Sequence, residues 1–404
     1  MELLEVRRQF LVIFCIILTL LTKRLVAERK LDITYNEQCN ITECSHSEDG
    51  SKPNLVHITA EGDNDTIHFL WSSIGAPAVL LARTTLEAEL VVNWMELLAN
   101  TSTGSISFKP EESVLYASAL MFTRLIEYND TNDDGVMKPH DKQKTTELDL
   151  LKWQNGTIDP KNFQAVLNSS LGELGNHGTI SLSLTAFGRS GRLTRLPHLQ
   201  HTENTTQLDL TLQNLTLSYP NSRLALEVIV VGRDNRSNQV NLQEITSIDD
   251  EYTPAVFSTL NMRVPHSPVG SYIQWKPVAY TLTDRAMENA RHVYEYKLVT
   301  DKQQINVPYT SIAHAFFSSE AMAQVGALNI SFGISKDGFF KKTNYTSWSA
   351  TIGYGNPPEE FMTLTVYVII SAGLGIPLVI VVFGGAGVCI SKHRKRKKAV
   401  LRCN

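Results

Sequence analysis

The feature that most constrains this chain is an uncharged stretch of 31 residues near its C-terminus, Phe361–Ser391. It follows two glutamates and ends at the basic block Lys392–Lys398. The hydrocarbon core of a bilayer takes about 20 apolar residues in a helix, so this stretch can cross a membrane with some tilt. Basic residues remain on the cytosolic side of a span. The sequence therefore predicts one transmembrane helix, residues 361–391, with the C-terminus in the cytosol.

Such a helix would carry five glycines, whose small size lets another helix approach closely. Two buried helices broken at Pro377 are the alternative interpretation. An uncharged run followed directly by basic residues favours membrane insertion instead. Residues 392–404 then form a short cytosolic tail, and the residues before Glu360 lie on the other side of the membrane.

The N-terminus indicates translocation as well. A pair of arginines precedes the apolar segment Phe10–Leu21, which is too short to span a bilayer, and small residues near Ala27 suit a cleavage site. This pattern predicts a signal peptide at residues 1–27. Lys23 and Arg24 are unusual within a cleavage region, so an uncleaved signal is the alternative.

The charge of the chain is uneven. The whole chain has 37 Lys and Arg against 41 Asp and Glu, a net charge of −4. Residues 1–27 hold four basic and two acidic residues, and residues 361–404 hold seven basic and no acidic residues. The remaining 26 basic and 39 acidic residues give the segment 28–360 a net charge of −13. An ectodomain this acidic is not expected to bind nucleic acid.

Cysteine is scarce in the expected ectodomain. Of the five cysteines, only Cys39 and Cys44 lie between the signal peptide and the span. They can pair in an oxidising compartment, where such a small loop contributes about 2 kcal/mol at most. The ectodomain is therefore not a disulfide scaffold and must be held by its own cores.

Asn-x-Ser/Thr triplets are frequent and lie only in this region. In a translocated chain they are acceptors for N-glycosylation. The sequence therefore predicts a heavily glycosylated luminal surface. The acceptor asparagines are Asn40, Asn64, Asn100, Asn129, Asn155, Asn168, Asn204, Asn214, Asn235, Asn329 and Asn344.

The ectodomain mostly shows the period-two alternation of half-buried β-strands. Thr179–Phe187 and Thr206–Leu217 alternate apolar and polar residues over their whole length. Many short strands without interleaved helices predict an all-β fold of two β-sandwich-like units. The irregular stretch Gly188–Thr205 is the expected boundary. The predicted segments are an N-terminal luminal segment at 28–52, a first β-rich domain at 53–190 and a second at 205–358.

Catalytic motifs are absent from the sequence. It contains no Gly-x-Ser-x-Gly, His-Glu-x-x-His, Gly-x-Gly-x-x-Gly or phosphate-binding loop. His57 and His68 fall within predicted strands and are interpreted as structural or titrating surface groups. We therefore expect a protein that is not an enzyme and needs no cofactor.

Two acidic clusters contain side chains that bind metal ions in other proteins. Asp130, Asn132, Asp134 and Asp141 have a spacing similar to that of a calcium-binding loop, with a glycine at the bend. The last position lacks the bidentate glutamate, and Asn129 makes the same place a glycan acceptor, so a polar surface loop without metal is predicted. The other cluster, Asp249-Asp250-Glu251, is expected to be a solvated turn.

Several strings in the chain resemble the glycosylated lysosomal membrane protein family. They are HITAEGDNDTIHFLWSSIG at His57–Gly75, FTRLIE at Phe122–Glu127, SIDDEYTPAVF at Ser247–Phe257 and QWKPVAY at Gln274–Tyr280. Shorter matches at Ala315–Phe317 and Tyr345–Trp348 extend the resemblance across nearly the whole ectodomain.

This resemblance implies a lysosomal type I glycoprotein without catalytic activity. It implies an accessory role for a major-facilitator-type transporter that exports dipeptides from lysosomes. The glycosylated luminal domain would shield that transporter from luminal proteases, and the transporter would depend on it for lysosomal residence.

The sequence departs from the family in two places. Cysteines expected near Thr206 and near Val325–Leu328 are absent, so the family's luminal disulfides are not carried over. The family's tyrosine-based sorting signal is also absent, since Ser391–Asn404 contains no tyrosine. A receptor-like binding glycoprotein of the cell surface or endosome is therefore the alternative function.

Overall fold

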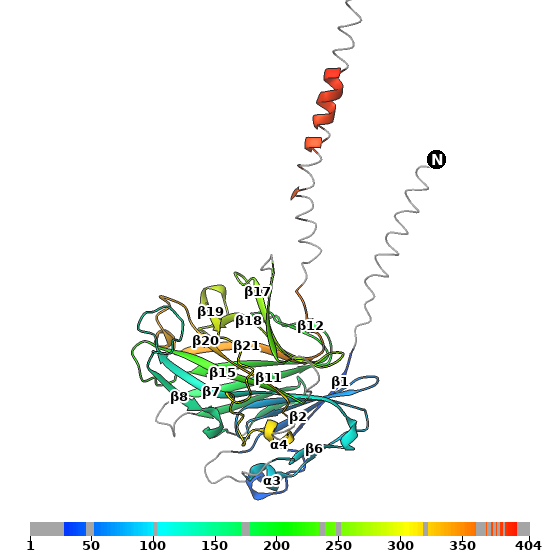
Figure 1. The fold of residues 1–404 in the computed structure, drawn as a ribbon, viewed down its shortest axis with the longest axis vertical. Coiled ribbons are helices and arrows are strands. Elements are labelled where there is room, and N and C mark those ends of the chain that lie inside the picture. Colours follow the sequence, from blue (N-terminus) through cyan, green and yellow to red (C-terminus); the bar gives the residue numbers. More distant parts are fainter. Residues whose placement is uncertain are drawn as a thin grey trace, which may run out of the picture. The chain divides into compact units, whose positions relative to one another are not determined.

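In a computed structural model of the chain, the described residues are 28–45, 52–99, 103–154, 156–170, 178–233, 239–247, 252–317, 322–360, 369, 373–374, 377, 380–382 and 384–393. The chain divides into two units, Met1–Pro358 and Glu359–Asn404. In the described part of the first unit, 17 strands are connected by hydrogen bonds into two facing sheets (Figure 1). The predicted all-β class is confirmed.

Sheet one is antiparallel throughout. Its strands lie side by side in the order β1 (Lys30–Tyr35), β2 (Leu55–Glu61), β3 (Thr66–Ser72), β4 (Ala78–Thr84), β7 (Val114–Asn129), β15 (Ser222–Gly232), β20 (Gln324–Phe332) and β19 (Ala290–Glu295). Strand β8 (Gln143–Glu147) pairs with the second half of the long strand β7.

Sheet two is also antiparallel. Its order is β9 (Thr157–Asp159), β10 (Gln164–Ser170), β11 (Thr179–Phe187), β14 (Thr205–Gln213), β21 (Tyr345–Tyr354), β18 (Ser271–Tyr280), β17 (Ser258–Val264) and β16 (Asn241–Thr246). Strand β19 joins the sheets, because Ala290–His292 pair with β18 while Val293–Glu295 pair with β20. A strand that changes sheets forms a corner of the sandwich.

The inner core lies between the two sheets. It forms because apolar and polar residues alternate along the strands. In β11, Ile180, Leu182 and Leu184 point into it, while the intervening residues are partly exposed. Trp275 of β18 and Trp348 of β21 are fully buried there, with their rings edge to face at 6.1 Å. The inner core takes side chains from both sheets, so it holds the first unit together.

A third layer covers the other face of sheet one and encloses a second cluster, the outer core. This layer contains α3 (Trp94–Leu98), α4 (Ile312–Phe316) and the hairpin of β5 (Glu89–Val92) and β6 (Ile106–Lys109) (Figure 1). The loop bearing α2 (Thr42–Ser45) and the Cys39–Cys44 disulfide packs against the same cluster. This layer explains why every residue of β3 is buried.

The expected boundary at Gly188–Thr205 does not separate two domains. The stretch forms the short hairpin β12 (Gly191–Arg192) and β13 (Gln200–His201) and then leads directly into β14. Sheet one takes strands from both predicted domains, since β7 pairs with β15. The predicted division into units at 53–190 and 205–358 is therefore wrong, because one inner core needs both halves of the chain.

The remaining short elements are single turns of 3-10 helix: η1 (Glu111–Ser113), η2 (Leu148–Leu150), η4 (Met287–Asn289) and η5 (Phe340–Lys342). In the second unit, residues 384–393 are helical. Among the described positions of the chain, we find no helix with the length and apolarity needed to cross a bilayer. The predicted signal peptide (1–27), most of the predicted span and the tail beyond residue 393 lie outside the described residues.

Candidate functional sites in the first unit

The loop that resembles a calcium site closes on its own first aspartate. Asp130 is buried at the end of β7 and accepts hydrogen bonds from the backbone N–H groups of Asp134 (3.2 Å) and Gly135 (2.8 Å). Gly135 has a φ of +79°, a conformation that side chains disfavour. The sharp bend predicted from the glycine is present, and the carboxylate of Asp130 stabilises it.

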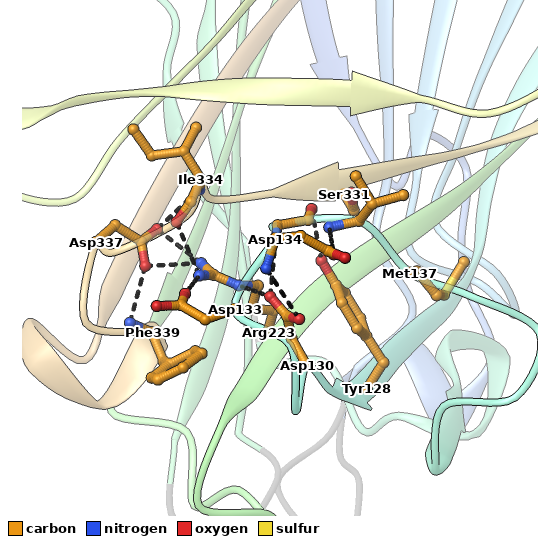
Figure 2. A network of polar contacts seen from close by, with 12 residues as sticks. Tyr128, Asp130, Asp133, Asp134, Met137, Arg223, Ser331, Ile334, Asp337 and Phe339 are labelled. Atoms are coloured by element: carbon orange, nitrogen blue, oxygen red, sulfur yellow. Dashed lines mark hydrogen bonds and ion pairs between the residues drawn. The ribbon is translucent and has the colours of Figure 1, made fainter.

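Arg223 of β15 lies where a bound cation would be expected (Figure 2). Its Nε donates to Asp130 Oδ2 at 2.7 Å, and its Nη2 donates to Asp133 Oδ1 at 2.7 Å. Its Nη1 contacts both carboxylate oxygens of Asp337 at 2.7 Å, and Nη2 also donates to the carbonyl of Ile334 at 2.8 Å. All five donors of the guanidinium are therefore used. We call Arg223 and these three aspartates the Arg223 cluster.

The Arg223 cluster is closed to solvent at its centre. The Arg223 side chain is only 1% exposed, and the ring of Phe339 covers the guanidinium with its centroid 4.7 Å away. Burial lowers the pKa of Arg223, but hydrogen bonds to Asp130 and Asp337 raise it more, so the net shift is upward. The three carboxylates are therefore paired with a fixed internal cation.

The other members of the calcium-like pattern point elsewhere. Asn132 is exposed, Asp134 pairs with Lys138, and Asp141 accepts a hydrogen bond from the Lys138 backbone at 2.7 Å. Within the described ranges, no three His, Cys, Asp or Glu side chains are grouped so that they could hold a metal ion. Asp249-Asp250-Glu251 lies outside those ranges.

A second polar network lies on the outer face of sheet two, where buried polar side chains replace an apolar core. Arg285 donates to Asp209 at 3.0 Å and to Ser349 at 2.7 Å, and also to the carbonyl of Leu196 at 2.9 Å. The Leu196 contact ties the β12–β13 hairpin to the sheet. This hairpin is therefore a cover for sheet two.

Two of the sequence segments that resemble the family contact each other beneath the β12–β13 hairpin. Lys276, from QWKPVAY, donates to Thr253 Oγ1 at 2.7 Å, and Thr253, from SIDDEYTPAVF, donates to the carbonyl of Pro197 at 2.6 Å. Next to them, the Arg192 guanidinium stacks on Tyr252 at 3.6 Å. These strings therefore fasten the β12–β13 hairpin to sheet two.

A groove with a volume of about 590 Å³ lies between the start of β1 and the β12–β13 hairpin. Ser190 and His201 both line it, but they do not form a nucleophile–base pair. Ser190 Oγ donates to Glu203 at 2.9 Å, while His201 Nδ1 contacts the Arg189 carbonyl at 3.0 Å. Burial lowers the pKa of His201 to about 4. The hydrogen bond expected of an activated serine is not made here.

His57 of β2 and His68 of β3 are both buried. Of the two interpretations given above, they are therefore structural groups and not surface groups. His57 Nε2 lies 2.9 Å from His68 Nδ1, and His68 Nε2 lies 3.0 Å from Thr84 Oγ1. Burial lowers the pKa of His57 to about 4 and that of His68 to about 3.

The described acceptor asparagines are distributed over turns and strands of both sheets. Asn40, Asn64, Asn214 and Asn344 are exposed, while Asn129, Asn168, Asn204 and Asn329 are half-buried. The backbone N–H of Asn214 donates to the carbonyl of Asn344 at 2.8 Å, so these two acceptors are neighbours. Asn100, Asn155 and Asn235 lie outside the described residues. Glycosylation of these sites stays a prediction.

Cys39 and Cys44 form a disulfide with a Cα–Cα distance of 6.1 Å. The loop is held to the third layer because Trp94 Nε1 of α3 donates to the Glu37 carbonyl at 2.9 Å. The sequence indicated this pairing, but it did not indicate Arg223, Asp133, Asp337 or Arg285. Those residues are far apart in the chain, since Arg223 is 93 positions from Asp130, and no local motif connects them.

Comparison with known proteins agrees with the resemblance in the sequence. The profile of the family described as glycosylated lysosomal membrane protein matches residues 54–395. Glycosylated lysosomal membrane protein B of Xenopus laevis is 34% identical over 385 residues, which cover 91% of each chain. The Danio rerio protein is 34% identical over 361 residues (85% of this chain and 86% of the relative), and the Homo sapiens protein 34% over 356 residues (86% of each). This chain therefore belongs to the glycosylated lysosomal membrane protein family.

Proposed function

We propose that this lysosomal membrane glycoprotein is not an enzyme and that it stabilises a multi-pass dipeptide transporter of the major-facilitator type. It would bind the transporter and protect it from lysosomal proteolysis. Its ectodomain would lie in the lumen, held by one span at residues 361–391, with a cytosolic C-terminus. The observation that carries the proposal is a sandwich whose buried ionic groups are internally paired and whose surface carries glycan acceptors on many sides.

The internal pairing supports a structural role. In the described residues, Arg223 and Arg285 direct their guanidinium groups to aspartates of the same chain. The groove beside the β12–β13 hairpin also keeps Ser190 and His201 in separate hydrogen bonds. A catalytic site needs a nucleophile and a base within reach of each other and of a substrate. The ionic and polar side chains described above instead hold the layers of this unit together.

The glycan acceptors support a shielding role. The exposed acceptors lie on several parts of the unit: Asn64 in the β2–β3 turn, Asn40 beside the disulfide, and Asn214 with Asn344 at the ends of β14 and β21. Proteases cleave segments that open locally, in proportion to the population of the open form. A bound partner lowers that population, and bulky glycans on the partner add a steric barrier.

A receptor-like binding glycoprotein of the cell surface or endosome is the second candidate. The observation that favours it is the absence of tyrosine from the tail, Ser391–Asn404, which removes the family's sorting signal from this chain. In the accessory role, the transporter itself could supply the sorting information. The two candidates therefore differ in both compartment and partner.

A crosslinked pull-down from a lysosome-enriched membrane fraction tests compartment and partner together. The accessory role predicts enrichment of the protein in this fraction and recovery of one multi-pass transporter at acidic pH. A control pull-down from the plasma-membrane fraction should then recover little of either protein. Enrichment at the cell surface, with a soluble ligand and no transporter, would instead support the receptor-like role.

A further inference from the structure

The histidine pair forms a hydrogen-bonded row on the face of sheet one that the third layer covers. His57 and His68 are neighbours on β2 and β3, with ring planes inclined by 17° and centroids 5.2 Å apart. The Phe108 ring from β6 closes the row at 4.6 Å from His68. The Phe108 ring therefore covers the row beside His68.

Thr84, the last residue of the row, determines where the hydrogens along the row lie. Thr84 Oγ1 lies 2.9 Å from the Thr85 carbonyl, which can only accept, so the hydroxyl donates there. Thr84 Oγ1 must then accept from Nε2–H of His68. The Nδ1 of neutral His68 is an acceptor and receives the Nε2–H of His57. One ring nitrogen, Nδ1 of His57, is left without a hydrogen.

This nitrogen faces a carboxylate. Glu37 Oε2 lies 3.8 Å from His57 Nδ1, which is too long for a hydrogen bond. Thr34, the cross-strand partner of His57 on β1, donates to the same oxygen at 3.1 Å and so keeps the carboxylate near this nitrogen. An unprotonated nitrogen and a carboxylate oxygen do not attract each other. The two groups can therefore form a hydrogen bond only after one more proton is added.

Glu37 also connects the row to the disulfide loop. Its carbonyl is the acceptor for Trp94 Nε1 of α3, and Cys39 follows two residues later. The Glu37 side chain is 47% exposed, so it can move. A shift of about 1 Å would give a charge-assisted hydrogen bond of about 2.8 Å between His57 and Glu37.

We propose that Nδ1 of His57 is a proton-binding site, and that its protonation in acid draws Glu37 into a direct ion pair. This pair would fasten the disulfide-containing segment Tyr35–Cys44 onto sheet one. The titratable groups around His57 are Glu37 and Asp32 from the β1 segment and His68 from β3, and the uncharged Phe108 of β6 packs on His68. Burial disfavours protonation of His57, whereas the charges of Glu37 and Asp32 favour it. The order of hydrogen bonds in the row leaves Nδ1 of His57 as the nitrogen that can accept the proton.

Hydrogen–deuterium exchange at histidine C2, measured by mass spectrometry on the full-length glycoprotein in detergent, tests the site. We expect His57 to titrate at a higher pH than His68. Glu37→Gln should lower the titration midpoint of His57 by about one pH unit, because it removes the facing charge. The matched control Glu43→Gln, in the same disulfide loop, should leave this midpoint unchanged. If His68 titrates first, or if Glu37→Gln leaves His57 unchanged, the proposal is wrong.

Backbone amide exchange of residues 35–44 tests the consequence. At pH 7 the wild-type and Glu37→Gln proteins should exchange alike in this segment, which also shows that the variant folds. At pH 4 the wild-type segment should exchange several-fold more slowly than the variant segment, and Glu43→Gln should behave like the wild type. Equal exchange of wild type and Glu37→Gln at both pH values would overturn the fastening of the loop.

Discussion

At the scale of single residues, Arg223 shows how this fold uses charge. A buried arginine is costly to desolvate, and it is stable only when its donors are all used. Asp130, Asp133 and Asp337 provide this compensation from two separate loops. Gly333, at φ +118°, permits the close approach, because a Cβ there would collide with the guanidinium. The cluster therefore fastens the loops that follow β7 and β20 to strand β15.

Replacement of Arg223 by Met should destabilise the protein strongly. Loss of one partner from a buried ionic group costs about 3–5 kcal/mol, because the remaining charges are left uncompensated. Denaturant unfolding of the full-length protein, followed by tryptophan fluorescence, measures this cost. Arg189→Ala, at an exposed arginine, is the control and should change the stability by less than about 0.5 kcal/mol. A similar small effect of Arg223→Met would show that the cluster is not important for stability.

Local sequence could predict only part of this cluster. Asp130 and Gly135 are close in the chain, so the bend was predictable. Asp337 lies 114 positions from Arg223, and no spacing rule connects residues that only the pairing of β7, β15 and β20 brings together. The calcium-like spacing contains only Asp130 of the three aspartates, and both the cation and Asp337 come from distant parts of the chain.

At the scale of elements, alternation was a reliable guide where one face of a strand is polar. Strand β11 has the bounds predicted for it, whereas β14 begins one residue before and ends four residues before the predicted strand. In the sequence, the β12–β13 hairpin resembles a domain boundary because its polar residues do not alternate. The hairpin is held to the polar outer face of sheet two through its backbone, as in the hydrogen bonds from Arg285 to the Leu196 carbonyl and from Thr253 to the Pro197 carbonyl. No periodicity in the sequence predicts that such a hairpin covers a sheet.

The crossing strand β19 should give the fold a pH dependence. Its Glu295 accepts a hydrogen bond from Trp275 Nε1 at 2.9 Å, and burial raises the pKa of Glu295 to about 7. The pKa of this group is higher in the folded than in the unfolded state. Its stabilising contribution is therefore present below the unfolded value of 4.5 and is lost as the pH rises through about 7. Glu295 favours the fold in acid.

We expect Glu295→Gln to remove this dependence, because an amide resembles the protonated acid. At pH 7.5 the variant should be more stable than the wild type by about 1–3 kcal/mol, a range that allows for partial solvent screening. At pH 4.5 the two should be equal. Urea unfolding at both pH values measures the difference, with Glu288→Gln in the adjacent turn as the control. Equal differences at pH 4.5 and 7.5 would contradict the assignment to Glu295.

At the scale of the whole molecule, the first unit is a three-layer structure built from both halves of the ectodomain sequence. The two sheets enclose the inner core, the third layer covers sheet one, and the β12–β13 hairpin covers sheet two. Most polar groups that these layers bury are used within them. The surface left over carries the acceptor asparagines, which fits a domain that shields a partner in a lysosomal membrane.

The half-life of the transporter tests this account most directly. In cells that lack this protein, pulse–chase labelling of the partner recovered in the pull-down should show unchanged synthesis and a half-life shortened several-fold. Inhibitors of lysosomal proteases, or re-expression of this protein, should restore the half-life. If deletion leaves the half-life of the transporter unchanged, the accessory role is wrong and the receptor-like role becomes the better explanation.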